Sequence, residues 1–258
     1  RDAGVKVIVF SLCRTGELKG DAAANASAWM KMGGKVIEIL TSEAAQAARR
    51  TVEEASIVID AIFGTGLTKV VKGVHADAIR LINGAAKKVL SIDIPSGVNA
   101  TTGAVLGEAV KAGVTATMAM PKLGLFLSPG RSYAGRVEVV DIGVPKEAAE
   151  DPSIRWNLLV PSDMRRILKP RKLDAHKSSH GHLLVLAGSP GMTGAAYMSG
   201  MAAMRTGVDL VYLAAPAKTA LAISSMSPDL ITIKLEGNNL NPANMETLKP
   251  YLAMVDAV

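Results

Sequence analysis

The chain has 258 residues, of which 49% are hydrophobic and only 3% aromatic, so it is long enough for one large or two small domains with an aliphatic core. Its formal net charge of +6 is spread along the chain, and so few aromatic side chains for stacking on bases disfavour a nucleic-acid partner. No apolar run approaches the roughly 18 residues of a membrane span, and the single cysteine, Cys13, excludes an intramolecular disulfide. We therefore expect a cytoplasmic protein with neither a membrane nor a nucleic-acid partner.

Apolar runs typical of β-strands alternate with helical segments in the first half of the chain. This alternation implies parallel βαβ units, with helices covering both faces of a sheet. The first half is therefore predicted to be a Rossmann-like, three-layer α/β domain. The expected strands cover residues 5–10, 35–40, 57–60, 89–93, 114–118 and 136–141, and the expected helices cover 21–32, 42–55 and 74–85.

A charged, alanine-rich stretch at 146–152, bounded by prolines, predicts a connector to a second α/β domain. We place the two domains at residues 1–150 and 157–258. Both ends of the chain fall within an unfinished pattern, so we expect it to be cut at both ends. In the second half the expected strands are 183–187, 210–214, 230–235 and one from Val255, with helices at 194–206, 217–225 and 242–248.

Asp60 and Asp93 each end an apolar strand and are followed by a turn that contains glycine. Carboxylates at the carboxyl ends of parallel strands face the crevice in which ligands bind, so we expect both to line one pocket. Ser96 could add a further oxygen ligand, and a set of oxygen ligands suits K⁺, Mg²⁺ or Ca²⁺. Capping of neighbouring backbone amides by both aspartates is an equally good interpretation of the residues alone.

Two glycine-containing loops follow strands. The loop 64–70 lacks the third glycine of the dinucleotide fingerprint, because Lys69 stands in its place, and this disfavours an ordinary dehydrogenase. Its glycines still allow a ligand to approach the backbone closely, although a tight turn explains them equally well. The loop 188–196 opens a helix whose free amides could face an anion; a turn before a packed helix is the alternative.

His176, His180 and His182 crowd together before the first strand of the second half. Their spacing invites a transition-metal interpretation, but no carboxylate beyond Asp174 lies nearby. We interpret them as solvated loop residues that could contact a phosphate.

The order of these motifs along the chain resembles that of the bifunctional NAD(P)H-hydrate repair enzymes. Those enzymes join an epimerase domain to an ADP- or ATP-dependent dehydratase domain. The resemblance implies an epimerase domain without its N-terminal part at 1–150, and the beginning of a ribokinase-like dehydratase domain at 157–258. It rests on segments 18–25, 60–67, 93–97 and 121–125 in the first half, and on 176–177, 181–185 and 187–196 in the second.

The resemblance also implies specific roles. A potassium ion is expected on Asp60 and Ser96, and Asp93 is expected to act in acid/base catalysis or to orient the substrate. The implied substrates are NADHX and NADPHX, whose C6 epimers the epimerase interconverts, and the dehydratase uses ADP or ATP. We also expect a homo-oligomer. The residues expected to contact substrate are Gly64, Thr65, Gly66, Leu67, Thr68, Lys69, Val70, Asp93 and Ala195.

The family's glycine-rich epimerase loop is expected before Arg1, and its nucleotide loops and catalytic aspartate after Val258. The chain as written is therefore expected to be inactive as a dehydratase and impaired or inactive as an epimerase. The alternative to the repair enzyme is a ribokinase-like small-molecule kinase fused to a non-catalytic Rossmann-like ligand-binding module.

Overall fold

The computed structural model describes residues 4–168 and 170–258, which form two compact units, Arg1–Leu158 and Leu159–Val258. All strand pairs within them are parallel, and strands alternate with helices, so the expected α/β class is confirmed. None of the helices in the described part of the chain is both long and apolar enough to cross a membrane.

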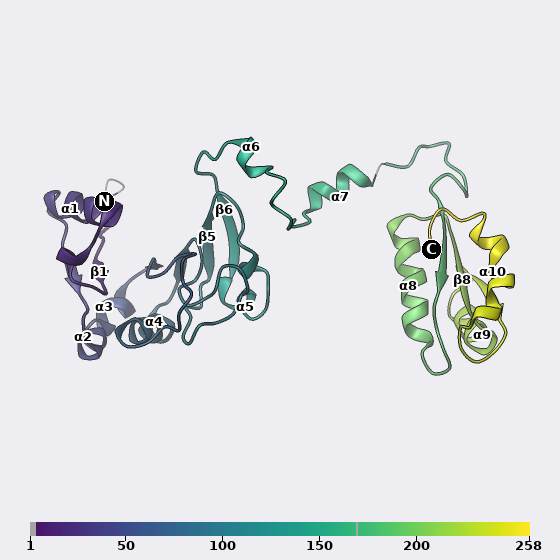
Figure 1. Ribbon diagram of the computed structural model, residues 1–258, viewed down its shortest axis with the longest axis horizontal. Coiled ribbons are helices and arrows are strands. Elements are labelled where there is room, and N and C mark those ends of the chain that lie inside the picture. Colours follow the sequence, from purple (N-terminus) through teal and green to yellow (C-terminus); the bar gives the residue numbers. More distant parts are fainter. Residues whose placement is uncertain (1–3, 169) are drawn as a thin grey trace. The chain divides into compact units, whose positions relative to one another are not determined.

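Unit 1 contains a two-stranded sheet, β1-β2, and a four-stranded sheet in the order β3-β4-β5-β6 (Figure 1). Its strands are β1 Val9–Ser11, β2 Val36–Glu38, β3 Val58–Asp60, β4 Val89–Ile92, β5 Val114–Met118 and β6 Arg136–Val140. Its helices are α1 Gly20–Lys31, α2 Ser42–Ala47, α3 Arg49–Glu54, α4 Val74–Ala85, α5 Arg131–Ala134 and α6 Lys146–Ala149, with short 3₁₀ turns at Thr15–Glu17 and Leu123–Leu125.

The helix α4 covers one face of the four-stranded sheet, because its apolar residues recur at helical spacing. Ile79 and Ile82 pack against Val89 of β4 and against Val58 of β3. On β3 the next residue, Ile59, points the other way and remains 60% exposed, as the alternation of a strand requires. The described part of this sheet is therefore covered on the α4 side and open at Ile59.

Unit 2 has a three-stranded sheet, β7-β8-β9, with helices on both faces. Alternate residues of β8 point to opposite faces of the sheet. Val211 and Leu213 pack in a cluster with α8 and α9, while Ala214 packs with Leu248 of α10. Figure 1 accordingly shows β8 between α8 and α10. The elements are α7 Pro161–Ile167, β7 His182–Leu186, α8 Thr193–Thr206, β8 Leu210–Pro216, α9 Ala217–Met226, β9 Ile231–Leu235, a 3₁₀ turn Pro242–Asn244 and α10 Met245–Leu252.

Five expected elements differ from the structure. One is the helix expected at 242–248, which is a 3₁₀ turn at Pro242–Asn244 followed by α10. The strand expected at 5–10 begins only at Val9, because β1 pairs solely with the three residues of β2 within the described ranges. The helix expected at 42–55 is two helices that meet at Ala48. The connector at 146–152 includes the short helix α6, and the strand expected from Val255 is a single bridge between Leu183 and Ala257.

Candidate functional site

Asp60 is the last residue of β3, and only 1% of it is exposed. Its Oδ2 accepts hydrogen bonds from the Ser91 hydroxyl at 2.7 Å and the Ser96 amide at 2.9 Å. Its Oδ1 accepts from the Ser96 hydroxyl at 2.6 Å and, at 3.4 Å, from the Ile62 amide. No basic side chain in the described ranges forms an ion pair with Asp60, so its buried carboxyl is held by neutral donors alone.

Ser96 joins the loop after β4 to the loop after β3. Its hydroxyl donates to Asp60 and accepts a 2.8 Å hydrogen bond from the Phe63 amide. The next residue, Gly97, has a φ of +99°, and a Cβ there would lie 2.0 Å from the carbonyl oxygen of Glu108. Only glycine fits this close approach, which fixes the position of Ser96.

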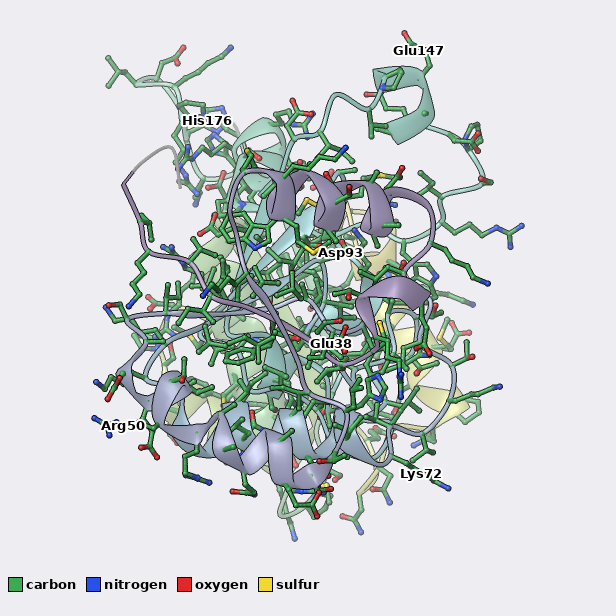
Figure 2. The ribbon with its side chains drawn as sticks, turned by 90° about the vertical axis from the view of Figure 1, so that its left-hand side faces the viewer. Glu38, Arg50, Lys72, Asp93, Glu147 and His176 are labelled. Carbon is green, nitrogen blue, oxygen red and sulfur yellow. The ribbon has the colours of Figure 1, made fainter. Side chains whose placement is uncertain are left out.

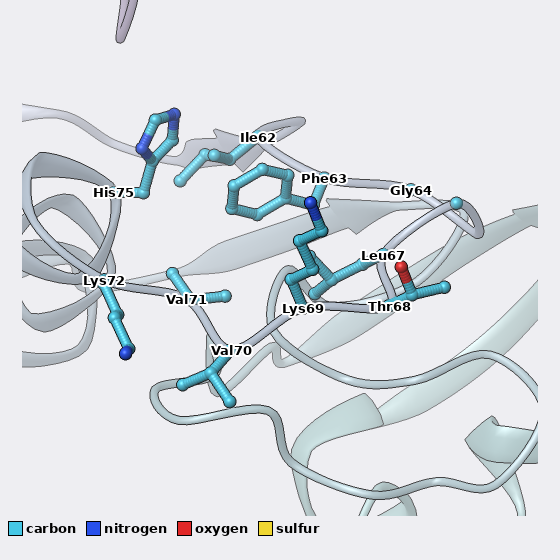
Figure 3. A pocket seen from close by; sticks show the side chains of 11 residues that line it. Ile62, Phe63, Gly64, Leu67, Thr68, Lys69, Val70, Val71, Lys72 and His75 are labelled. Atoms are coloured by element: carbon cyan, nitrogen blue, oxygen red, sulfur yellow. The ribbon is translucent and has the colours of Figure 1, made fainter.

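A pocket of about 590 Å³ lies on the loop that follows β3. In Figure 3 the Phe63 ring stands between the imidazole of His75 and the side chain of Lys69. The ring centroids of Phe63 and His75 are 5.1 Å apart. Because the Phe63 amide also binds Ser96, one wall of the pocket is attached to the Asp60–Ser96 cluster. The pocket is lined by Ile62, Phe63, Gly64, Gly66, Leu67, Thr68, Lys69, Val70, Val71, Lys72 and His75.

Asp93 follows the last residue of β4 and has a positive φ of 69°, which is uncommon for a residue other than glycine. Its Oδ1 accepts hydrogen bonds from the Lys122 ammonium at 2.5 Å, the Met118 amide at 3.1 Å and the Thr117 hydroxyl at 3.4 Å. The Lys122 ammonium also donates to the Met118 carbonyl at 2.7 Å. Figure 2 labels Asp93, whose side chain is 21% exposed, together with the exposed Arg50 and Lys72 of the same unit.

Two opposing effects act on the pKa of Asp93. Burial of the carboxyl raises its pKa, while the hydrogen bonds from Lys122 and from the Met118 amide lower it, together with the charge of Lys122. The net pKa lies below its ordinary value, so Asp93 is an ionised hydrogen-bond acceptor at neutral pH.

The structure brings some of the expected site residues together and leaves others apart. Asp60 and Ser96 are in direct contact, and six of the seven residues of the 64–70 loop line the pocket, Thr65 being the exception. Asp93 directly follows the adjacent strand β4, but no hydrogen bond joins it to Asp60 or Ser96 within the described ranges. Neither aspartate is a lining residue of the pocket.

Sequence reasoning missed two partners of these carboxylates, Ser91 and Lys122. Ser91 is completely buried within β4, and a serine in an otherwise apolar run was its only signal. Lys122 belongs to the segment 121–125, which carried part of the resemblance without a role for the lysine.

In unit 2, Ala195 lies exposed in the first turn of α8. The residue before this helix, Met192, provides no side-chain cap, so the first amides of α8 keep their hydrogen-bonding capacity for solvent or a ligand. The loop 188–191 leads into this turn, and Gly188 and Gly191 both have positive φ.

His180 and His182 of unit 2 form hydrogen bonds with different partners. The backbone amide and ring Nδ1 of His180 both contact Asp209, whose carboxylate also pairs with Arg171 at 2.9 Å. The amide of His182 donates to Asp256. No group of three or more His, Cys, Asp or Glu side chains within residues 4–168 and 170–258 is arranged to hold a metal ion.

Comparison with known families covers both units. Residues 1–124 match the model of the YjeF-related protein N-terminus, and residues 183–257 match the model of NAD(P)H-hydrate dehydratase. A protein of Moorella thermoacetica named bifunctional NAD(P)H-hydrate repair enzyme Nnr is 36% identical over 249 residues, 96% of this chain and 47% of the relative. Both halves of the chain therefore contain segments similar to the bifunctional NAD(P)H-hydrate repair enzymes.

Two other relatives in this repair-enzyme family carry the same name. The protein of Hyperthermus butylicus is 40% identical over 80% of this chain and 36% of its own length. The protein of Coxiella burnetii is 32% identical over 99% of this chain and 49% of its own length. The chain thus spans about half the length, or less, of the curated relatives it matches. The first family model includes Asp60, Asp93 and Ser96, and the second includes Ala195.

Proposed function

We propose that this chain takes part in the repair of hydrated nicotinamide cofactors, with residues 1–150 as the epimerase domain and 157–258 as part of the dehydratase domain. The observation that supports this most is the oxygen-rich cluster at the ends of β3 and β4, which adjoins a 590 Å³ pocket inside the segment matched by the YjeF-related model. The names of the relatives support the same reaction.

The loop after β3 is the proposed substrate cradle. Gly64 and Gly66 have open space where a Cβ would stand, so their backbone is accessible to a ligand. Lys69 adds a positive charge at the rim that suits the diphosphate of NADHX or NADPHX. Together with Asp93, the proposed contacts are therefore Gly64, Thr65, Gly66, Leu67, Thr68, Lys69 and Val70.

Asp93 is the proposed acid/base or orienting residue of the epimerase. The C6 hydroxyl of the hydrated ring must leave and return, or the ring must open and close, for the two epimers to interconvert. An ionised carboxylate can accept a hydrogen bond from that hydroxyl and hold it in place.

A potassium ion fits Asp60 and Ser96. The Asp60 carboxyl is buried, and a bound monovalent cation would offset the cost of burying a carboxylate charge. Its Oδ1 receives only one short hydrogen bond, since the Ile62 amide lies 3.4 Å away, and the Ser96 oxygen can accept one contact besides that from Phe63. When bound, the ion would supply positive charge next to the anionic substrate.

Salt-dependent stability tests the potassium site. The midpoint of thermal unfolding should be higher in KCl than in tetramethylammonium chloride at equal ionic strength, because a ligand that binds the folded state stabilises it. Ser96→Ala should remove this difference, whereas Thr68→Ala, in the neighbouring loop, should retain it. Identical midpoints of the unsubstituted chain in both salts would exclude the site.

For unit 2 we propose that the α8 N-terminus and Ala195 border the substrate of a dehydratase that consumes ADP or ATP. The free amides of the first turn of α8 support this, since they favour an anionic group. The match of residues 183–257 to the dehydratase model is the second support, and it weakens the case for a separate small-molecule kinase.

Chromatographic separation of the NADHX epimers tests the proposed epimerase. The protein that carries this sequence, given one epimer, should regenerate the mixture faster than buffer alone, and Asp93→Asn should slow it by at least tenfold. The control Asp141→Asn replaces an exposed carboxylate and should leave the rate unchanged. A protein that binds NADHX without interconverting the epimers would instead be a binding module.

We further propose that the protein is cytoplasmic and forms a homo-oligomer. The lone Cys13 fits a reducing compartment. Light scattering coupled to size exclusion measures the assembly, and a monomer mass would contradict the homo-oligomer.

A further inference from the structure

Two adjacent strands of unit 1 end in the same unusual turn. After β4 the amide of Ile94 donates to the carbonyl of Ile92 at 2.8 Å around Asp93, whose φ is 69°. After β5 the amide of Met120 donates to the carbonyl of Met118 at 2.7 Å around Ala119, whose φ is 60°. Both are three-residue γ-turns with positive φ, a rare and strained form.

These turns begin at the last contacts between the strands. The amide of Asp93 donates to Ala116 of β5 at 2.8 Å, and the amide of Ala119 donates to Val140 of β6 at 2.9 Å. Strained backbone persists only where surrounding contacts hold it, and such positions cluster at functional sites. These two turns are therefore expected to be held in place by contacts with surrounding residues.

The ammonium of Lys122 connects both turns. It donates to the Asp93 carboxylate in the first turn and to the Met118 carbonyl in the second. The Met118 amide donates back to the same carboxylate oxygen. Lys122 and Asp93 each keep 21% of their side chain exposed, so the pair is partly desolvated and stronger than a surface ion pair. We call this arrangement of Asp93, Met118 and Lys122 the clasp.

The clasp uses only one oxygen of Asp93. All three hydrogen bonds, from Lys122, Met118 and Thr117, end on Oδ1. Within the described residues no donor reaches Oδ2. An ionised carboxylate oxygen of a partly exposed side chain, whose other oxygen is fixed, is suited to accept a hydrogen bond from a ligand hydroxyl or amide.

We propose that Lys122 is a positioning residue, which holds Asp93 by Oδ1 and so presents Oδ2 to the hydroxyl of the substrate. This inference rests on the proposed epimerase function and deepens it. Lys122 is proposed to act through Asp93, because the hydrogen bonds of its ammonium in the described residues go to the Asp93 carboxylate and the Met118 carbonyl. No other titratable side chain of the described residues contacts Asp93; β5 contributes only the neutral donors Thr117 and Met118.

The epimerisation rate of three variants tests the clasp. Lys122→Met should lower kcat by at least tenfold with KM changed less than threefold, since a misplaced Oδ2 affects the transition state more than binding. The acid limb of the pH profile should move to higher pH, because the positive charge that lowers the pKa of Asp93 is gone. Lys122→Arg should restore most of the rate, and the exposed control Lys111→Met should change neither quantity.

A second measurement separates the clasp from the activity. Carbon-13 labelling of aspartate carboxyls should show the Asp93 resonance titrating at higher pH in Lys122→Gln, which keeps a neutral donor, than in the unsubstituted chain. If the protein that carries this sequence does not interconvert the epimers, the proposed function is overturned, and the NMR titration still decides the clasp. Wild-type kcat and acid limb in Lys122→Met, or an unmoved Asp93 resonance in Lys122→Gln, overturns the positioning role.

Discussion

Asp60 and Asp93 end neighbouring strands of one sheet, yet their carboxylates are held in opposite ways. Asp60 sits in ordinary strand backbone, is 1% exposed, and has both oxygens engaged by neutral donors. Asp93 sits in a strained turn, keeps 21% of its side chain exposed and has one oxygen fixed by a lysine. The same residue type at equivalent strand ends thus closes a buried hydrogen-bond network in one case and keeps one oxygen unengaged, within the described residues, in the other.

From this difference we expect removal of Asp60 to affect mainly stability and removal of Asp93 to affect mainly activity. A buried carboxylate with four donors organises its surroundings, so its removal should chiefly unfold the unit. A partly exposed carboxylate in a strained turn contributes less to stability, so its removal is expected chiefly to affect activity. Both tryptophans, Trp29 and Trp156, belong to unit 1, and their fluorescence can follow its unfolding in urea.

The largest effect is expected from Asp60→Ala. It leaves two hydroxyls and the Ser96 amide without their acceptor inside the protein, and the free energy of unfolding should fall by about 3 kcal/mol. Asp93→Ala should cost about 1 kcal/mol, since its partner Lys122 can turn to water. Urea titration followed by tryptophan fluorescence measures both. Equal losses of unfolding free energy in Asp60→Ala and Asp93→Ala would contradict the expected difference between the two aspartates.

The donors of the two carboxylates should differ in the same direction. Ser91→Ala removes a buried 2.7 Å hydrogen bond to Asp60 and should cost about 1.5 kcal/mol. Thr117→Val removes a 3.4 Å contact to Asp93 and should cost less than about 0.5 kcal/mol, because the long bond contributes little. The same urea titration compares them, and a larger loss in Thr117→Val would contradict the comparison.

Asp93 should make stability depend on pH in the acid range. Its folded-state pKa is lowered from 3.8, so the ionised form stabilises the fold above that pH, and this contribution is lost as pH falls through the folded-state pKa. The unfolding midpoint in urea, measured from pH 6 down to pH 3, should therefore fall less steeply in Asp93→Asn than in the unsubstituted chain. Parallel curves would show that Asp93 contributes nothing.

The smallest effect is expected from Ala119→Gly, which relieves the positive φ of the second turn. Relief of about 1 kcal/mol of strain is partly offset by the greater freedom of glycine in the unfolded chain, so a net gain of about 0.5 kcal/mol is expected. Ala116→Gly, in the interior of β5, should instead destabilise. A loss of stability in Ala119→Gly would show that the turn is unstrained.

The convergence of Asp60 and Ser96 could be predicted from the sequence, because parallel strands bring their carboxyl ends to one edge. The partner of Asp93 could not. Lys122 lies 29 residues further along the chain, and neither periodicity nor spacing indicates that a lysine will fold back to that carboxylate. The pairing of Asp60 with Ser91 likewise depends on the register between β3 and β4.

Local patterns in the sequence determined the parallel α/β class and the limits of elements such as α4 and β5, because residue alternation and helical spacing are short-range properties. They also determined the two aspartates and the glycine loop at the strand ends. The tertiary structure alone decided which carboxylate oxygen is engaged, which donor reaches it and which turn is strained. Those outcomes depend on strand register and on contacts between distant residues, and they distinguish the two aspartates.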